Sequence, residues 1–255
     1  MNLGLPISTL FAFLLVLFRI TGLLLFLPFP ALRSAPRPAK LILAVALTVM
    51  LFPLWPNLAN EIPTIGELLR WALAEAGFGL TIGLSVSLLL AAFQLAMQIV
   101  GLQAGYGYSM TIDPASQADS SVLQLGFALF TALLIFVTGI DRELIRILAD
   151  TLRAYPPGQW TPSAATLDAV IELGSIMCTT AVRIAFPLAA LLLLIDIALA
   201  LLGRMQQQLQ LISLAFPIKM LLAIVVLAMM APVFPRIFAR LAASMTANLH
   251  TALGI

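Results

Sequence analysis

Residues able to do chemistry are few and scattered in this sequence. The only histidine, His250, has no metal-ligand pattern around it, and the only cysteine, Cys178, cannot form a disulfide within the chain. The acidic residues are dispersed, so no pair suggests general acid–base catalysis, and nucleotide-binding and metalloprotease motifs are absent. The sequence therefore predicts a protein that is not an enzyme and that holds no cofactor and no metal.

Four charged residues interrupt long apolar stretches: Arg19, Glu75, Arg183 and Asp196. A charge at the centre of a bilayer costs about 2.5–3.5 kcal/mol on insertion scales, so such residues usually face a partner or a water-filled cavity. One interpretation is pairing within the chain, for example Arg19 with Glu75 or Arg183 with Asp196. The other is a large assembly with a hydrated lumen, and the two interpretations are compatible.

Small residues recur every four positions in the third apolar stretch, at Gly79, Gly83, Ser87 and Ala91. In a helix this spacing keeps them near one face. Small residues let two helix backbones approach closely, which drives association where lipid competes for apolar surface. The stripe predicts a helix-packing face, either within this chain or against another subunit.

The stretch from Gln94 to Ser121 is the most unusual part of the sequence. Gln94 and Gln98 lie one helical turn apart and precede a glycine-rich segment with aromatic residues. That segment contains Gly101, Gly105, Tyr106, Gly107, Tyr108, Met110 and the Asp113-Pro114 pair. Non-helical backbone at membrane depth is tolerated only where it is buried in protein or lines an aqueous path. The segment is either a pore plug or an ordinary loop with tyrosines at the membrane interface.

A third polar segment runs from Gly203 to Gln210 and joins two apolar stretches. It combines Arg204 with four glutamines, among them Gln208. Amide side chains can form hydrogen bonds between helices of different subunits. Such a contact within an assembly and a simple solvent-exposed turn both fit this composition.

The elements that carry these residues are apolar and long. The chain has 255 residues, of which 62% are hydrophobic and 9% charged, against about 45–50% and about 25% in soluble domains. A helix that crosses a membrane needs roughly 20 mostly apolar residues, and six stretches qualify, although the second is short. They cover about 8–28, 40–55, 67–101, 121–139, 168–202 and 211–230, and an amphipathic tail follows from 235. Proline clusters separate most of them. We predict an all-α, polytopic membrane-type protein with about six long helices arranged as hairpins in a single domain.

Several motifs, taken in chain order, resemble the FliR family, and the likeness covers essentially the whole chain. They are Phe18-Arg19-Ile20-Thr21-Gly22 followed by Pro28, Pro38-Ala39-Lys40-Leu41, Glu75-Ala76-Gly77, Gly101-Leu102-Gln103-Ala104-Gly105 followed by Asp113-Pro114, Arg183-Ile184-Ala185-Phe186-Pro187, Arg204 to Gln208, and Phe216-Pro217-Ile218-Lys219. The segment from Gly101 with Asp113-Pro114 is the most specific of these matches.

This resemblance implies a structural subunit of the flagellar type III protein export gate, in the bacterial inner membrane and the flagellar basal body. FliR-like proteins join FliP-like and FliQ-like subunits in a helical assembly through which unfolded flagellar subunits pass. FlhB-like and FlhA-like proteins and rod subunits are the further partners implied. The resemblance also implies a FliP-like part over about 1–200 and a FliQ-like hairpin over about 201–255. Neighbouring subunits rather than lipid would then surround most of the helices.

The resemblance also implies a role for the glycine-rich segment. In the family, the loop after the third long helix is the central plug of the channel. That role falls here on residues 105–121, with Tyr106, Tyr108 and Met110 as the side chains that block the lumen.

Other function classes remain open at this point. The homologous injectisome subunit of virulence secretion shares the fold and mechanism, and gene neighbours would discriminate between the two systems. A small-solute transporter would require inverted repeats and broken helices around a midplane site. A membrane enzyme would require a catalytic cluster. Nucleic-acid binding is disfavoured by the formal charge of +2 and by the lack of a basic run with interleaved aromatic residues.

Overall fold

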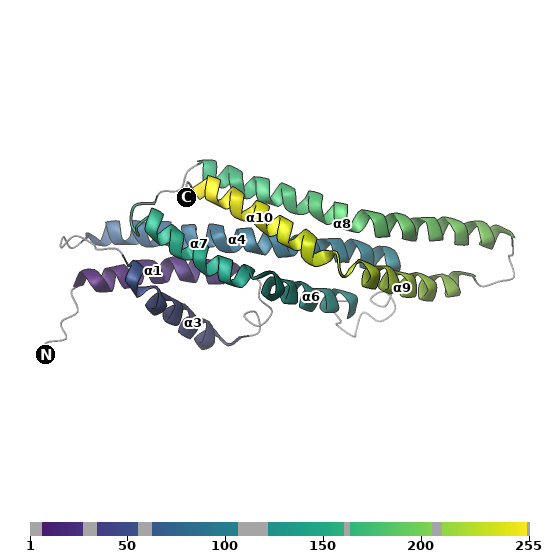
Figure 1. Ribbon diagram of the computed structural model, residues 1–255, viewed down its shortest axis with the longest axis horizontal. Helices are drawn as coiled ribbons and strands as arrows, with labels where there is room; N and C mark the ends of the chain where they lie inside the picture. The colour runs from purple at the N-terminus through teal and green to yellow at the C-terminus, as the bar shows by residue number, and fades with distance from the viewer. Residues whose placement is uncertain are drawn as a thin grey trace. The chain divides into compact units, whose positions relative to one another are not determined.

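The computed structural model describes residues 7–27, 35–55, 63–106, 122–160, 164–205 and 211–253. All regular structure in these ranges is helical, which confirms the predicted all-α class (Figure 1). The elements are α1 (Ile7–Phe26), α3 (Arg37–Met50), the 3-10 helix η1 (Phe52–Leu54), α4 (Ile65–Ala104), α6 (Val122–Thr138), α7 (Ile140–Ala154), α8 (Ala164–Met205), α9 (Leu211–Met230) and α10 (Phe234–Leu253).

Local sequence chemistry fixes several helix ends. At the start of α4, the Thr64 hydroxyl and backbone N–H both donate to the Glu67 carboxylate, over 2.8 and 2.9 Å. The Glu67 N–H in turn donates to the Thr64 hydroxyl over 3.4 Å, so the two residues together satisfy backbone donors that a helix start leaves free. Between α6 and α7, Gly139 adopts a φ of 76°, a left-handed conformation that glycine takes without steric cost. The predicted fourth stretch therefore ends at this residue, and the polar helix α7 begins after it.

The prediction of about six long apolar helices is met only in part. Within the described ranges, three helices are long and apolar enough to cross a membrane: Ile7–Phe26, Ile65–Ala104 and Thr166–Arg204. A fourth span arises if Pro217–Met230 and Phe234–Leu249, which are bent by 64° at their junction, count as one. The second predicted stretch is α3, with only 14 residues, and α6 has 17.

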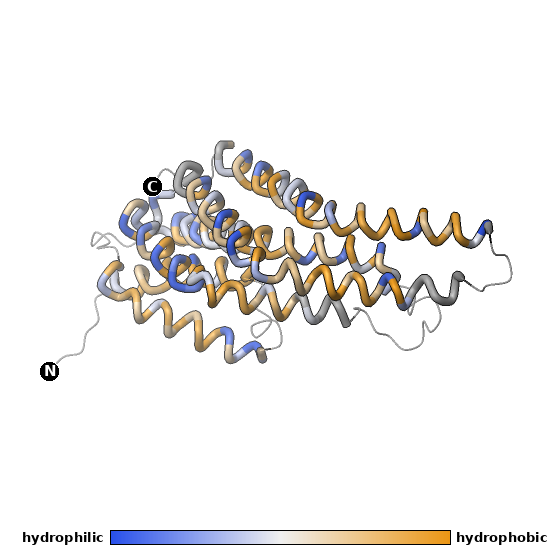
Figure 2. The backbone as a smooth tube through the Cα atoms, turned by 45° about the vertical axis from the view of Figure 1, so that its right-hand side comes forward, coloured by the Kyte–Doolittle hydropathy of each residue, from blue (hydrophilic) through white to orange (hydrophobic). Residues whose placement is uncertain are grey.

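Two of these helices are much longer than a bilayer requires. α4 has 40 residues and α8 has 42, so each runs for about 60 Å at about 1.5 Å per residue. The hydrocarbon core of a bilayer is about 30 Å thick. Figure 2 shows apolar residues over most of the second half of α8. A single crossing of a membrane therefore does not account for the apolar length of α4 or α8.

The chain divides into two compact units, each built from separate stretches of sequence. Unit 1 comprises Met1–Leu89, Gly139–Gly174 and Ala242–Ile255, and unit 2 comprises Leu90–Thr138 and Ser175–Leu241. The helices α4, α8 and α10 each contribute residues to both units. This division follows contacts within the chain. The division into a FliP-like part and a FliQ-like part near residue 200 is a different one and stays a prediction.

Unit 1 has a core formed where α1 lies alongside the first half of α4 (Figure 1). The two helices run parallel in this region, since Arg19 meets Gly79 and Leu23 meets Gly83. The short helix α3 follows α1 and packs against it. The Trp55 ring links the two helices. It contacts Phe13 of α1 at a centroid distance of 5.5 Å, and its Nε1 donates to the Thr48 carbonyl of α3 over 3.0 Å.

Unit 2 has an aromatic core between the second half of α4, the start of α10 and α6. The Phe93 ring lies 5.2 Å from the Phe238 ring and 6.3 Å from the Phe234 ring, and Phe130 lies 5.9 Å from Phe234. Edge-to-face aromatic pairs at these distances contribute about 0.5–1.5 kcal/mol beyond area burial. These contacts hold α10 against α4 and α6 within this unit.

Candidate functional site

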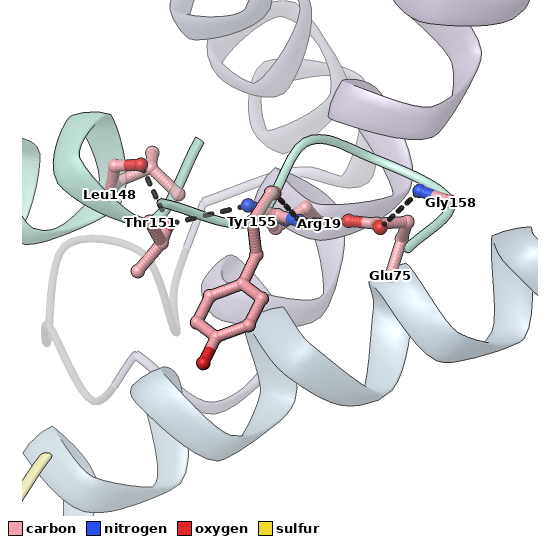
Figure 3. A network of polar contacts seen from close by, with 6 residues as sticks. All are labelled: Arg19, Glu75, Leu148, Thr151, Tyr155 and Gly158. Carbon is pink, nitrogen blue, oxygen red and sulfur yellow. Dashed lines mark hydrogen bonds and ion pairs between the residues drawn. The ribbon is translucent and has the colours of Figure 1, made fainter. Parts of the chain in front are cut away.

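A buried ion pair connects α1 to α4 in unit 1 (Figure 3). Arg19 donates from Nε to the Oε2 of Glu75 over 2.6 Å, and both side chains have a relative exposure of 0%. The structure thus contains one of the two pairs that the sequence suggested. Because a buried charge without a partner is strongly destabilising, the two helices depend on each other for their position.

Both charged groups have further partners near the end of α7. Arg19 also donates from Nη1 to the Thr151 hydroxyl over 3.4 Å and from Nη2 to the Tyr155 carbonyl over 3.0 Å. The Oε1 of Glu75 accepts from the Gly158 N–H over 2.9 Å. Figure 3 shows this network reaching from α1 and α4 to the turn after α7. The pair therefore also holds the connection between α7 and α8.

Aromatic rings enclose the same site. The guanidinium carbon of Arg19 lies 4.5 Å from the centroid of the Phe78 ring, within the range of a cation–π contact. The Phe78 ring in turn meets the Trp160 ring edge-on at 5.0 Å. Gly158 has a φ of 94°, and a Cβ there would lie 3.3 Å from the Trp71 ring. Glycine suits this position because it combines a left-handed backbone with a close aromatic neighbour.

Two of the four residues in the predicted small-residue stripe, Gly79 and Gly83, pack against α1 of the same chain. A Cβ at Gly79 would overlap the carbonyl oxygen of Arg19, and a Cβ at Gly83 would overlap that of Leu23. Gly22 makes the reciprocal contact, since its Cβ would overlap the carbonyl oxygen of Ala76. These glycines let the backbones of α1 and α4 touch, which is the spacing that the Arg19–Glu75 bond requires.

The other two members of the stripe are not part of this contact. α1 ends at Phe26, about one turn beyond the residue that Gly83 contacts. Ser87 and Ala91 follow on α4 and are both half-buried. Their predicted packing against another subunit stays a prediction.

A second charged cluster lies in unit 2 and differs from the pair suggested by the sequence. Asp196 binds Lys219 rather than Arg183, with its Oδ1 at 2.8 Å and its Oδ2 at 3.0 Å from the lysine Nζ. Gln103 also donates from Nε2 to the Asp196 Oδ2 over 3.3 Å. Arg183 and Asp196 lie on the same helix, about 20 Å apart along its axis, so they cannot meet.

The cluster fixes the helical hairpin of α8 and α9 and the end of α4. Lys219 has a side-chain exposure of 11%, whereas Asp196 has 38%. The lysine is therefore the more buried partner, and leaving its charge without a counter-ion would cost more free energy than leaving the aspartate unpaired. Asp196 lies about as far before the end of α8 as Lys219 lies after the start of α9. The two residues therefore face each other across the hairpin, and their bond sets the register of the two helices.

The glycine-rich segment begins at a defined point in unit 2. Gly105 ends α4 with a φ of 87°, and the Tyr106 hydroxyl donates to the Met220 carbonyl of α9 over 3.0 Å. Partial burial raises the pKa of the Tyr106 phenol above its ordinary value of 10.0. The remaining predicted plug residues lie outside the described residues: Gly107, Tyr108, Met110, Asp113 and Pro114.

The other residues predicted to make polar contacts are exposed or only partly buried. Gln94 is half-buried, and Gln98 and Arg204 are exposed. None of the three has a side-chain hydrogen bond within the part of the chain that the structure describes. Gln208 lies outside that part. Their role in contacts between subunits stays a prediction.

Sequence reasoning quoted Gly22 and Lys219 only as parts of family motifs and assigned neither of them a contact, and it did not select Thr151. A usable signal existed for Lys219, because it is the one charged residue of the apolar helix α9. Gly22 lies one turn after Arg19, which is the spacing of a backbone contact beside a buried pair. Thr151 had no distinguishing signal in the sequence. Within the described ranges, no group of three or more histidine, cysteine, aspartate or glutamate residues could hold a metal ion.

Comparisons with known proteins agree with this picture. A family model described as bacterial export proteins, family 1, matches residues 10–245. The chain is 30% identical over 217 residues to the flagellar biosynthetic protein FliR of Escherichia coli strain K12, covering 85% of this chain and 82% of that protein. It is 29% identical over 206 residues to FliR of Pectobacterium carotovorum, covering 80% and 77%.

A relative from a second system is also similar. The chain is 28% identical over 224 residues to the surface presentation of antigens protein SpaR of Salmonella typhimurium, covering 85% of this chain and 82% of that protein. Each of these matches extends over most of both proteins. The chain therefore belongs to the FliR family of bacterial export proteins.

Proposed function

We propose that this chain is a structural subunit of the flagellar type III export gate. In this proposal it closes a helical assembly of FliP-like and FliQ-like subunits and plugs the channel through which unfolded flagellar proteins leave the cell. As a member of an export-protein family, the chain is an export component and not an enzyme. FlhB-like and FlhA-like proteins and rod subunits complete the proposed set of partners at the inner membrane and the basal body.

The observation that carries the proposal is the match to bacterial export proteins over residues 10–245. The second half of α8 adds a large exposed apolar surface, with Val182 exposed at 53%, Phe186 at 68% and Leu202 at 52%. This part of the helix runs for about 30 Å. An apolar surface of this size is typical of a protein that lipid or other subunits cover.

The plug proposal is supported by the start of the glycine-rich segment. Tyr106 is held to α9 through its bond to the Met220 carbonyl, and Gln103 is held to α8 through Asp196. The chain therefore enters the segment 107–121 from a position fixed by three helices. A plug requires such a fixed base if it is to return to the same place after a substrate has passed.

A deletion experiment tests the proposed function in the cell. The gene is deleted in frame, and the proteins released into the medium are compared with those of the parent and the complemented strain. We expect rod, hook and filament subunits to disappear from the medium and motility to be lost. Normal motility and secretion in the deletion strain would contradict the proposal.

The injectisome is the second candidate system, because the sequence identity to SpaR, 28%, is close to the 30% identity to FliR of Escherichia coli. The same deletion separates the two systems. Loss of virulence effectors from the medium, with motility unchanged, would assign the chain to an injectisome.

A further inference from the structure

The carboxylate of Asp196 in α8 accepts from the side chains of two other helices of unit 2. Its Oδ1 lies 2.8 Å and its Oδ2 3.0 Å from the Nζ of Lys219 in α9. Its Oδ2 also accepts from the Nε2 of Gln103 in α4 over 3.3 Å. Three helices therefore meet at the two oxygens of one side chain.

Each of these two donors lies beside one partner of a second contact. Met220, which follows Lys219 in α9, offers its carbonyl to the Tyr106 hydroxyl over 3.0 Å. Tyr106 follows Gln103 by three residues, which is about one helical turn. The contact between Tyr106 and Met220 therefore joins the same two elements, the end of α4 and α9, that Asp196 already brings together.

The end of α4 connects Gln103 rigidly to Tyr106. The Tyr106 N–H donates to the Gly101 carbonyl over 3.0 Å, and the Gly105 N–H donates to the Leu102 carbonyl over 3.1 Å. Together with the left-handed φ of 87° at Gly105, these two bonds form a Schellman motif. The motif fixes the backbone of Tyr106 relative to the last turn of α4, so a displacement of Gln103 also displaces Tyr106.

The contact at Asp196 is the stronger of the two. A hydrogen bond between charged groups is roughly twice as strong as a neutral one, such as that of the Tyr106 phenol. Lys219 has a side-chain exposure of only 11%, so its ammonium group cannot exchange Asp196 for bulk water without a cost. The ion pair therefore determines where α9 and its carbonyl groups lie, and the phenol contact follows.

We propose that Asp196 is a positioning residue for Tyr106. It holds α9 through Lys219 and the end of α4 through Gln103. The Tyr106 hydroxyl reaches the Met220 carbonyl because both elements are held in this way. The consequence for the gate rests on the proposed function, since Tyr106 is one of the side chains assigned to the proposed plug.

Fluorine NMR tests this placement in the purified chain in detergent. 3-Fluorotyrosine is introduced at position 106 alone, and its chemical shift is compared with that of the same chain unfolded in guanidinium chloride. We expect Asp196→Leu to move the resonance most of the way to its unfolded position. Gln103→Leu leaves the ion pair intact and should move the resonance by a smaller amount. A resonance that stays in place in both variants would overturn the proposal.

Phe238→Leu is the matched control for a loss of stability in the same unit. Phe238 is fully buried in the aromatic core and contacts Phe93 rather than the polar cluster. The control should lower the thermal unfolding midpoint, as Asp196→Leu does, but leave the fluorine resonance in place. An equal displacement of the resonance in the two variants would show that Asp196 acts only through stability, which would overturn the proposal.

Conductance of the complex with FliP-like and FliQ-like subunits relates this placement to the gate. We expect Asp196→Leu to leak as much as Tyr106→Ala, and Phe238→Leu to stay as closed as the wild type. If Tyr106→Ala itself does not leak, the proposed plug fails, while the fluorine resonance still decides whether Asp196 places Tyr106. If Tyr106→Ala leaks and Asp196→Leu does not, only the inference fails.

Discussion

The Nε of Arg19 lies 2.6 Å from the Oε2 of Glu75, and neither side chain is exposed to solvent. The first residue belongs to α1 and the second to α4, which run parallel in unit 1. The carbonyl of Arg19 meanwhile touches the backbone at Gly79, one turn after Glu75. The ion pair and the glycine contact therefore depend on the same spacing between the two helices.

Removing one partner of the pair should destabilise unit 1 strongly. We expect Arg19→Met and Glu75→Leu each to lower the free energy of unfolding by about 3–5 kcal/mol, because each leaves an uncompensated buried charge. The double variant should lose much less, since two apolar side chains can fill the same space. Thermal unfolding of the purified chain in detergent, followed by circular dichroism, measures all three. A double variant that is as unstable as the sum of the single variants would contradict this account.

Two glycine-to-alanine substitutions should have opposite effects. Gly79→Ala places a methyl group on the Arg19 carbonyl and separates α1 from α4, so it should lower stability by about 1–3 kcal/mol or more. Gly174→Ala, in α8, meets nothing within 4 Å and should raise stability by about 0.5–1 kcal/mol through helix propensity. The thermal unfolding midpoints of the two variants, each compared with that of the unchanged chain, measure both effects. An unchanged or raised midpoint for Gly79→Ala would show that the α1–α4 contact is not as close as described.

The sequence allowed the all-helical class and the Arg19–Glu75 pair to be predicted, because two lone opposite charges in separate apolar helices need each other. It did not allow the Lys219–Asp196 pair to be chosen over Arg183–Asp196, although the shared helix of Arg183 and Asp196 already excluded their contact. The prediction of about six long apolar helices is met only in part, because apolar composition does not fix helix length. The stretches expected over 40–55 and 121–139 form helices of only 14 and 17 residues.

The Asp196–Lys219 pair should respond asymmetrically to substitution. Asp196→Leu leaves a largely buried lysine without a counter-ion, whereas Lys219→Met leaves an aspartate that reaches solvent. We therefore expect Asp196→Leu to be the more destabilising change, by about 1 kcal/mol or more, and the double variant to recover part of the loss. Unfolding of the isolated chain in detergent measures the difference. Equal effects of the two single substitutions would argue against the burial assigned to Lys219.

The proposed plug makes a prediction about leakage. Shortening the segment 107–121, or replacing Tyr106 and Tyr108 with alanine, should let ions or small molecules through the closed gate. Conductance of the assembled complex in planar bilayers measures this directly. Unchanged leakage in a complex that still assembles would count against the plug.

Tyr106→Phe separates two roles of this residue in the same assay. The phenylalanine keeps the ring but removes the hydrogen bond to the Met220 carbonyl. Leakage at the wild-type level would show that the ring itself blocks the channel. Leakage as high as that of Tyr106→Ala would show that anchoring to α9 is the essential contribution.

The proposed place of this chain in the export gate is tested most directly by the mass of the complex that it forms. The chain is tagged, co-expressed with the FliP-like and FliQ-like subunits of the same bacterium, and purified for native mass spectrometry. The account predicts a discrete complex that contains both partners and one copy of this chain. A monodisperse monomer or homo-oligomer, with both partners expressed but absent from the eluate, would contradict it.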